Sequence, residues 1–253
     1  PRFERRVGPY GEYLLPPVIE IPGGVYPIGE DQPIVDPATV KDDRAHMPRH
    51  DVAIAGFAVG QLAVTNAEYA HFMAAGGYDD ERWWETAAGL AWQRGETTAE
   101  GPKRNARDGL RLIREIPRLL EEWHKSGQMD DDIYERWQMR LAMTEAELEA
   151  HLAKLYPGGR ESEPRWPVVG ISWYEARAYC AWLSAQTGHA WRLPTEVEIE
   201  ATARGLGGRH HAYGGTFDAA KGNMLETRLK RPTPGGVFVE GDTPEGVGDT
   251  QGN

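Results

Sequence analysis

The sequence has a single cysteine, few phenylalanines and no long apolar run. Cys180 is the only cysteine among 253 residues, which excludes an internal disulfide within this sequence and is typical of a reducing compartment. No apolar stretch approaches the ~20 residues that a membrane-spanning helix needs, and residues 1–17 lack the apolar core of a signal peptide. We therefore expect a cytoplasmic location without membrane contact, for a chain whose first residue is not Met.

Basic side chains are also in deficit. The chain has 28 Lys and Arg against 39 Asp and Glu, a net charge of -11, so no nucleic-acid-binding surface is expected. Hydrophobic residues make up 40% and charged residues 26%, which favours a globular domain over a disordered or fibrous chain. The 9 Trp beside 5 Phe, together with 30 Gly and 18 Pro, predict a loop-rich fold whose interior is filled by indole rings.

Short strands are expected near the N-terminus. Residues 16–28 alternate apolar and polar positions around Gly23-Gly24, which predicts two strands joined by a tight turn. A third strand is predicted at residues 51–60. After Gly205 the chain consists of turn residues and short apolar pieces, which predicts further short strands and loops.

Four Ser or Thr residues that stand directly before a helical pattern are each followed three positions later by Glu. This spacing is the capping box that begins a helix, because the hydroxyl and the carboxylate each accept a bond from the other's backbone N–H. The predicted pairs are Thr65 with Glu68, Thr144 with Glu147, Ser172 with Glu175, and Thr195 with Glu198.

Two of these helices are expected to bury one apolar face each. The face of the first helix is predicted from Tyr69, Phe72 and Met73. The face of the third is predicted from Trp173, Ala176, Cys180 and Leu183. Cys180 is therefore expected to be a core residue, because buried thiols usually behave as small hydrophobes.

Residues 79–165 differ from their surroundings. They are charged and repeat with a helical period, as in "RDGLRLIREIPRLLEEWHKSG", with an interruption at Pro117. We interpret this stretch as a helical insertion within a single domain that extends over residues 1–253.

The run "WRLPTEVEIEATARG" begins with an arginine that local helix signals do not explain. Thr195 caps the helix, and Glu196 and Glu200 add negative charge near its N-terminus, where the helix dipole favours it. We expect Arg192 to be buried and paired with Glu196 or Glu200, or with Glu175 of the neighbouring helix, because a buried cation needs a carboxylate partner. These residues are predicted to be structural, and no residue is predicted to be catalytic.

Four segments together resemble one known family. In order they are "IPGGVYPIGE", "RHDVAIAGFAVGQLAVTNAEYAHFM", "PVVGISWYEARAYCAWLSAQTGHAWRLPTEVEIEATARG" and "GVGDTQGN". They resemble the formylglycine-generating-enzyme (sulfatase-modifying) domain over residues 16–78 and 166–253. The resemblance implies an α+β fold of the C-type lectin-like class, loop-rich, with short antiparallel strands, two main helices and the helical insertion, and with its C-terminal part following Asn253.

The resemblance also indicates which redox chemistry to look for. In the formylglycine-generating oxidases, two cysteines near the C-terminus bind copper(I), an ion that prefers soft thiolates. A related branch, the iron-dependent sulfoxide synthases of thiohistidine biosynthesis, is similar in "GGYDDERWW" and "PRHDVAIAGF" and takes three iron-binding His from a separate preceding domain. Cys180 stands alone here, so no copper site is expected within residues 1–253.

The histidines do not predict an iron site. His46 and His50 have a spacing that suits a helix, but Pro48 lies between them and no third ligand is evident. His210 and His211 are adjacent, so their side chains are expected to diverge. We therefore expect no iron site within residues 1–253.

A structural calcium ion is the one cofactor that the resemblance implies. It places one site at Asn223 with the carbonyl of Met224, and a second at Asp249 with the carbonyl of Gly252. Oxygen donors of this kind suit a hard cation. No clear acid follows Asn223, and the second site normally takes further ligands from beyond Asn253, so ordinary Asx-turns are the alternative.

Three classes of function remain open. The first is a non-catalytic domain that binds a protein or small molecule through loops on a rigid scaffold; similar domains occur as variable proteins of diversity-generating retroelements and as sensor modules. The second is a copper-dependent formylglycine-generating oxidase that acts on a sulfatase cysteine and has its catalytic cysteines beyond residue 253. A structural or oligomerisation module is the third possibility, but no motif in the sequence indicates it. We favour the binding domain.

Overall fold

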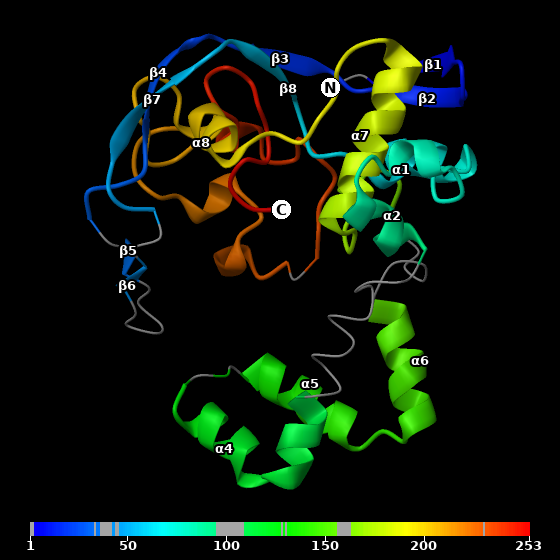
Figure 1. Ribbon diagram of the computed structural model, residues 1–253. Coiled ribbons are helices and arrows are strands. Elements are labelled where there is room, and N and C mark those ends of the chain that lie inside the picture. The colour runs from blue at the N-terminus through cyan, green and yellow to red at the C-terminus, as the bar shows by residue number, and fades with distance from the viewer. Residues whose placement is uncertain are drawn as a thin grey trace. The chain divides into compact units, whose positions relative to one another are not determined.

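The chain divides into two compact units in the computed structural model (Figure 1). Unit 1 contains Pro1–Asp31, His46–Glu85 and Glu161–Asn253, and unit 2 contains Gln32–Ala45 and Thr86–Arg160. The residues that the structure describes are 3–32, 34–35, 42–43, 46–94, 109–127, 129, 131–155, 163–229 and 231–253. Unit 2 thus includes most of the stretch that we interpreted as a helical insertion.

Unit 1 contains six strands, three α-helices and four short 3-10 helices among the described residues. The strands are β1 (Glu4–Gly8), β2 (Gly11–Leu15), β3 (Val18–Ile21), β4 (Gly24–Ile28), β7 (His50–Ile54) and β8 (Phe57–Gly60). The helices are α1 (Asn66–Ala74), α7 (Trp173–Thr187), α8 (Glu196–Arg204), η1 (Glu81–Trp83), η2 (Ala219–Lys221), η3 (Leu225–Thr227) and η4 (Val239–Gly241).

The first predicted hairpin is wrong in its pairing. Strands β3 and β4 exist, but β3 pairs with β8 and β4 with β7, both antiparallel, so the two do not pair with each other. The expected strand at 51–60 is likewise two strands, β7 and β8. Gly23 and Gly56 lie opposite each other at the break, where a Cβ on Gly23 would be 2.9 Å from the Gly56 nitrogen. Glycine at these two positions lets the two backbones approach closely. Because glycine is also a turn residue, the sequence alone does not distinguish such a close approach from a hairpin turn.

Sequence reasoning missed the hairpin of β1 and β2. Its register joins Glu4 to Leu15 and Gly8 to Gly11. Four of the five β1 residues are exposed, so this strand has no alternating apolar pattern for sequence analysis to detect. β2 packs against α1.

The capping boxes are confirmed. Thr65, Ser172 and Thr195 each cap their helix with the reciprocal Glu contact. In unit 2, Thr144 accepts from the Glu147 N–H at 3.3 Å and Glu147 accepts from the Thr144 N–H at 2.9 Å.

The expected inner faces of α1 and α7 are partly wrong. Met73 is 51% exposed and Trp173 is 56% exposed, although both were expected inside. The residues of α7 that are buried are Glu175, Ala178, Tyr179, Trp182, Leu183 and Gln186. The capping glutamates occupy part of the buried face of each helix. A pattern that counts only apolar residues therefore predicts a face that is shifted by about one residue from the face that is actually buried.

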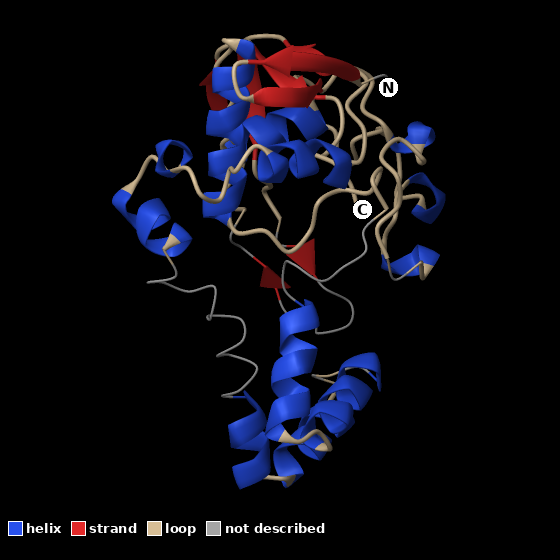
Figure 2. Cartoon of the chain, turned by 90° about the vertical axis from the view of Figure 1, so that its right-hand side faces the viewer, coloured by secondary structure: helices blue, strands red, loops and turns tan. Residues whose placement is uncertain are grey.

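Two groups of buried side chains form the core of unit 1. One lies between the β3–β4–β7–β8 ribbon and α8, and consists of Ile21, Tyr26, Ile28, Ile54, Ala201 and Val247. The other is aromatic and centres on Phe72 of α1, whose ring has its centroid 5.8 Å from that of Tyr78, 5.8 Å from that of Trp182 and 6.1 Å from that of Tyr179. Figure 2 shows the strands and helices of unit 1 from the side.

The regular elements among the described residues of unit 2 are helices and the short strand pair of β5 (Ile34–Val35) and β6 (Asp42–Asp43). Its helices are α2 (Ala87–Gln93), a helical stretch over residues 109–115, α4 (Arg118–Lys125), α5 (Asp131–Leu141) and α6 (Glu145–Leu155). The chain is interrupted at Pro117, directly before α4. Leu110, Ile113, Leu120 and Leu148 are buried in its core.

The described residues after Gly205 contain turns and 3-10 helices and no strand, so the short strands expected there are absent. Within the described part of the chain, none of the helices has the length and apolar character required to span a membrane.

Candidate functional site

Arg192 does not occupy the buried position expected of it. Its side chain is 59% exposed, and it forms two hydrogen bonds with Glu198, at 2.7 and 2.6 Å. Glu196 is exposed and Glu200 pairs with another arginine. The expected partners were therefore wrong, because Glu198, which closes the capping box, is the carboxylate that faces back toward the residues preceding α8.

Glu198 serves two purposes at the beginning of α8. It accepts a bond from the Thr195 N–H at 2.8 Å as well as from the Arg192 guanidinium. The Arg192 hydrogen bonds, followed by those of Thr195, lower the pKa of Glu198 from 4.5 to about 2, against the opposing effect of burial. The ion pair thus fixes both the helix end and the chain that leads into it.

Replacing Arg192 with Met should raise the pKa of Glu198 toward its ordinary value, because the largest stabilising contact of the carboxylate is lost. A lowered pKa adds stability above pH 4.5 that is lost as the pH falls toward 2. The stability difference between wild type and variant should therefore be greatest above pH 4.5 and disappear near pH 2. A 13C NMR titration of the Glu198 carboxyl carbon measures this; an unchanged midpoint in Arg192→Met would contradict the assignment.

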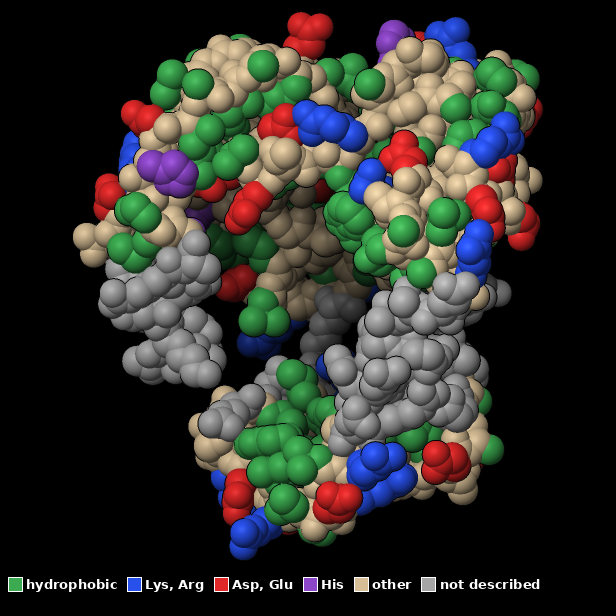
Figure 3. All heavy atoms as spheres, in the orientation of Figure 1, with side chains coloured by type: hydrophobic (Ala, Val, Ile, Leu, Met, Phe, Trp, Pro, Cys, Tyr) green, Lys and Arg blue, Asp and Glu red, His purple; other side chains and the backbone are tan. Residues whose placement is uncertain are grey.

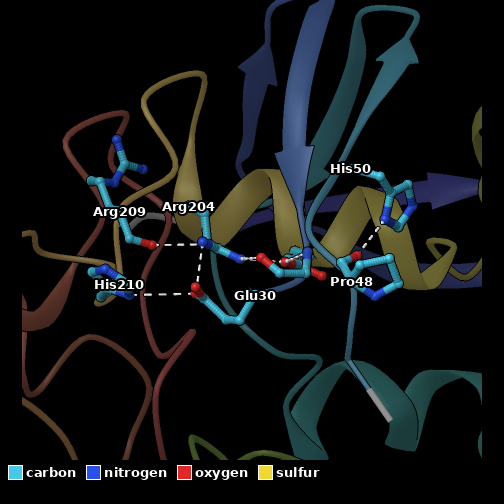
Figure 4. Close-up of polar contacts among 8 residues, drawn as sticks. Glu30, Pro48, His50, Arg204, Arg209 and His210 are labelled. Carbon is cyan, nitrogen blue, oxygen red and sulfur yellow. Dashed lines mark hydrogen bonds and ion pairs between the residues drawn. The ribbon is translucent and has the colours of Figure 1, made fainter. Parts of the chain in front are cut away.

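The buried arginine of this region is Arg204, at the C-terminal end of α8. It is 8% exposed, and its guanidinium donates to the carbonyl oxygen of Gly29 at 2.8 Å and to Glu200 at 2.6 Å (Figure 4). The guanidinium also lies 2.8 Å from Glu30 and donates to the Arg209 carbonyl at 3.1 Å. One side chain therefore joins the end of β4, the body of α8 and the loop after α8.

Sequence reasoning missed Arg204. The signal available was the i,i+4 spacing of Glu200 and Arg204, which places the two on one face of the helix. Glu200 also accepts the Gly29 N–H at 2.7 Å, so both polar groups of that glycine are paired with α8 side chains.

The histidines of this region do not converge on a common point. His210 lies 3.4 Å from Glu30 and His50 contacts the carbonyl of Pro48 at 2.9 Å, on the two sides of the view in Figure 4. His46 contributes its carbonyl to the Glu30 N–H at 3.1 Å. No group of three His, Cys, Asp or Glu with metal-binding geometry occurs among the residues that the structure describes.

A small cavity of about 170 Å³ lies between the β3–β4 turn and the end of α8. Its lining includes Ile21, Tyr26, Thr202 and the ion pair of Arg209 with Glu245, whose charged atoms are 2.8 Å apart. Pockets for drug-sized ligands are usually about 300–1,000 Å³. The cavity is below that range, and its two charged side chains already neutralise each other.

Cys180 lies on α7 and is partly buried. Burial raises the pKa of its thiol to about 11, with a smaller opposing effect of Arg177. A thiol with a raised pKa is a weak nucleophile and a weak metal ligand at neutral pH, because both roles need the thiolate.

The expected calcium residues lie in two places. A Cβ on Gly252 would be 2.7 Å from the Asn223 carbonyl, and the Asn253 N–H donates to that carbonyl at 3.2 Å. The Met224 carbonyl accepts from the Thr227 hydroxyl at 2.7 Å. The carbonyl oxygens of Asn223 and Met224 thus accept hydrogen bonds within the turn, and Gly252 lies against the backbone of Asn223.

Asp249, the remaining expected calcium residue, lies near a second carboxylate, that of Asp242. It accepts the Gly236 N–H at 3.2 Å, and Asp242 Oδ1 is buried without a hydrogen-bond partner in the described part of the chain. Burial raises the pKa of both carboxyls, and the charge of Asp249 raises that of Asp242 further. Two such oxygen donors with one unpaired atom suit a hard cation, so Asp249 fits calcium better than Asn223 does.

The segment after η2 presents apolar side chains to solvent. Both η3 and η4 pack on η2, and the exposed fractions are 88% for Leu225 and 66% for Val239. Figure 3 shows apolar side chains interspersed with charged ones on the surface of unit 1. We define the loop face by the exposed apolar and basic residues of residues 225–239 that the structure describes: Leu225, Arg228, Leu229, Arg231, Val237 and Val239.

The chain belongs to the sulfatase-modifying factor enzyme 1-like (FGE-sulfatase) domain family, whose model matches residues 6–111 and 130–248. The α+β, C-type lectin-like fold expected from the sequence is thereby confirmed. The solved structure of PvdO from Pseudomonas aeruginosa is similar over 94% of this chain and 68% of its own, with a TM-score of 0.51 and 21% identity. At that identity the likeness concerns the fold alone.

Curated relatives in this family carry different activities in their names. Hercynine oxygenase of Mycolicibacterium smegmatis is 28% identical over 90% of this chain and 41% of its own length. Inactive C-alpha-formylglycine-generating enzyme 2 of Bos taurus is 26% identical over 90% of this chain and 59% of its own. Formylglycine-generating enzyme of Streptomyces coelicolor is 28% identical over 78% and 50%. The chain therefore spans about two-fifths to three-fifths of these relatives, and the family alone does not define an activity.

Proposed function

We propose that this domain binds a macromolecular ligand through the loop face, and does so without catalysis. The observation that carries the proposal is the exposure of four apolar side chains between Leu225 and Val239. Contiguous exposed apolar surface is unfavourable in water and usually marks an interaction site.

The loop face is held in one arrangement, as a binding surface requires. Asn223 Nδ2 donates to the Arg231 carbonyl at 2.8 Å, and Asn253 accepts the Thr233 N–H at 2.7 Å. A Cβ on Gly241 would lie 1.8 Å from the carbonyl of Lys221, so η4 and η2 touch through their backbones. A surface that is ordered before binding loses less conformational entropy when its ligand arrives.

The name of the Bos taurus relative supports the idea that members of this family exist without formylglycine-generating activity. A role as the variable protein of a diversity-generating retroelement or as a sensor module is a finer form of the same proposal. The retroelement form predicts that codons of the loop face differ between otherwise identical gene copies, which sequencing would reveal.

Selection from a random peptide library on phage tests the binding function. Peptides enriched on the wild-type chain should lose binding to the double variant Leu225→Ser, Val239→Ser, because the apolar contacts are removed. They should retain it with the matched double variant Val7→Ser, Val25→Ser, which removes two equally exposed valines of β1 and β4. If no peptide is enriched, or enriched peptides bind all three proteins equally, the proposal is wrong.

An oxidoreductase is the second candidate, favoured by the similarity to hercynine oxygenase and to formylglycine-generating enzyme. Mass spectrometry of a Cys-x-Pro-x-Arg peptide incubated with the chain and copper(I) would detect cysteine oxidation. A parallel incubation with iron(II), hercynine and a thiol would detect sulfoxide formation. Turnover in either assay would replace the non-catalytic assignment.

We also propose that Asp249 binds a calcium ion. Calcium at about 100 times its dissociation constant should stabilise the EDTA-treated chain by about 2.7 kcal/mol, because a ligand that binds only the folded state stabilises it. Thermal unfolding with and without calcium measures this increase. Asp249→Asn should abolish it and Asp51→Asn, at an exposed position of β7, should not. An equal increase in both variants would refute the site.

A further inference from the structure

The loop face differs in charge from the rest of the protein. Residues 225–239 contain three basic residues and one acidic residue, whereas the whole chain has 28 basic and 39 acidic ones. A local excess of positive charge on an acidic protein attracts a negatively charged partner and repels a second copy of the same chain.

The basic side chains of the loop face lie among its apolar ones. Arg228 follows η3 directly, has a positive φ of 53° and is exposed, between Leu225 and Leu229 in the sequence. A non-glycine residue in this conformation is uncommon and costs backbone energy, so packing of the loop holds it there. The Arg228 N–H donates to the Leu225 carbonyl at 3.1 Å, which joins the arginine backbone to the η3 turn.

A second arginine is held by an aromatic ring. The Arg231 guanidinium lies 5.9 Å from the centre of the Trp166 ring, and its backbone carbonyl is bound by Asn223. A guanidinium stacked on a ring retains its charge and several free N–H donors, and arginine uses these to bind carboxylates in pairs. The loop face thus combines apolar contact area with two positioned cations.

We propose that the loop face binds an acidic peptide segment that presents Asp or Glu together with large apolar side chains on one side. This inference rests on the proposed binding function and names its partner class. In an extended peptide side chains two positions apart point to the same side, so a carboxylate and an apolar side chain at that spacing can both contact the loop face. Carboxylates of the partner would pair with Arg228 and Arg231 while its apolar side chains cover Leu225 and Val239.

Fluorescence polarisation with labelled peptides of one length tests this partner class. The probes are a Glu/Leu peptide with a Glu-Glu-Leu-Leu repeat, which carries both residue types on each side, a Lys/Leu peptide with reversed charge, and a Glu/Ser peptide without apolar side chains, both in the same repeat pattern. The Glu/Leu peptide should bind at least about tenfold more tightly than either control, and its affinity should fall as NaCl rises from about 50 to 500 mM, because the ionic contribution is screened.

Variants separate the partner class from the broader function. Arg228→Glu should weaken Glu/Leu binding about tenfold or more, while Arg5→Glu, at an exposed position of β1, should leave it unchanged. Equal binding of Lys/Leu and Glu/Leu, or no effect of Arg228→Glu, would overturn the acidic partner. If phage selection still yields peptides that depend on Leu225 and Val239, the binding function survives this result, and if it yields none, both proposals fail. If sedimentation shows that the wild-type chain is a dimer and that Leu225→Ser is a monomer, a second copy of the chain is the occupant, and the inference is also overturned.

Discussion

Replacing Arg204 with Met should lower the free energy of unfolding by about 3–5 kcal/mol, the usual cost of removing one partner from a buried ion pair. The change leaves Glu30 and Glu200 without their shared cation and removes the donors to the carbonyls of Gly29 and Arg209. Urea unfolding followed by circular dichroism measures the loss. A variant that fails to fold is the extreme form of the same result.

Arg192→Met is the matched control for this prediction. Both arginines pair with a glutamate of α8, but Arg192 is 59% exposed at its side chain and Arg204 only 10%. An exposed ion pair contributes about 0.2–1 kcal/mol, because water and salt screen it. Equal losses in the two variants would contradict the view that Arg204 is the hub between β4 and α8.

Replacing Phe72 with Ala should cost about 3–5 kcal/mol, the range for a buried phenylalanine whose site cannot collapse. Phe72 is 0% exposed and its ring lies within 6.1 Å, centre to centre, of the rings of Tyr78, Tyr179 and Trp182. Tyr179 and Trp182 are fixed on α7 and Tyr78 lies in the turn after α1, so these large rings cannot move in to fill the space. Chemical denaturation of the variant measures the loss.

Met73→Ala is the control for the core prediction. Met73 is the next residue of α1 and is 51% exposed, although the sequence pattern placed it inside. Its removal should change stability by no more than about 0.5 kcal/mol, as for most surface positions. A large loss at Met73 with a small one at Phe72 would reverse our assignment of the inner face.

Part of the candidate site could be predicted from the sequence. Thr195 and Glu198 were expected to begin α8 and do so, because a capping box requires only contacts three residues apart. The exposed apolar residues of the loop face were not identified. Loop sequences have no periodicity from which the exposure of a side chain can be predicted. In the sequence, the exposed residues Leu225 and Val239 therefore cannot be distinguished from buried apolar residues.

Which arginine is buried could not be predicted from the sequence. Arg192 was expected to be buried beside a carboxylate partner, yet the buried cation is Arg204. Burial of a side chain depends on what packs over it, and here the carbonyl of Gly29 and the carboxylate of Glu30 arrive from a segment some 170 residues earlier. No pattern within α8 contains that information.

The sequence by itself determined the helix starts, the family and hence the class of fold, because caps and motifs depend on residues close together along the chain. Only the tertiary structure decided the pairing of β3 with β8 and β4 with β7, the burial of Arg204 and the exposure of the loop face. These features depend on contacts between residues far apart in sequence, whose free energy becomes available only when the whole of unit 1 has folded.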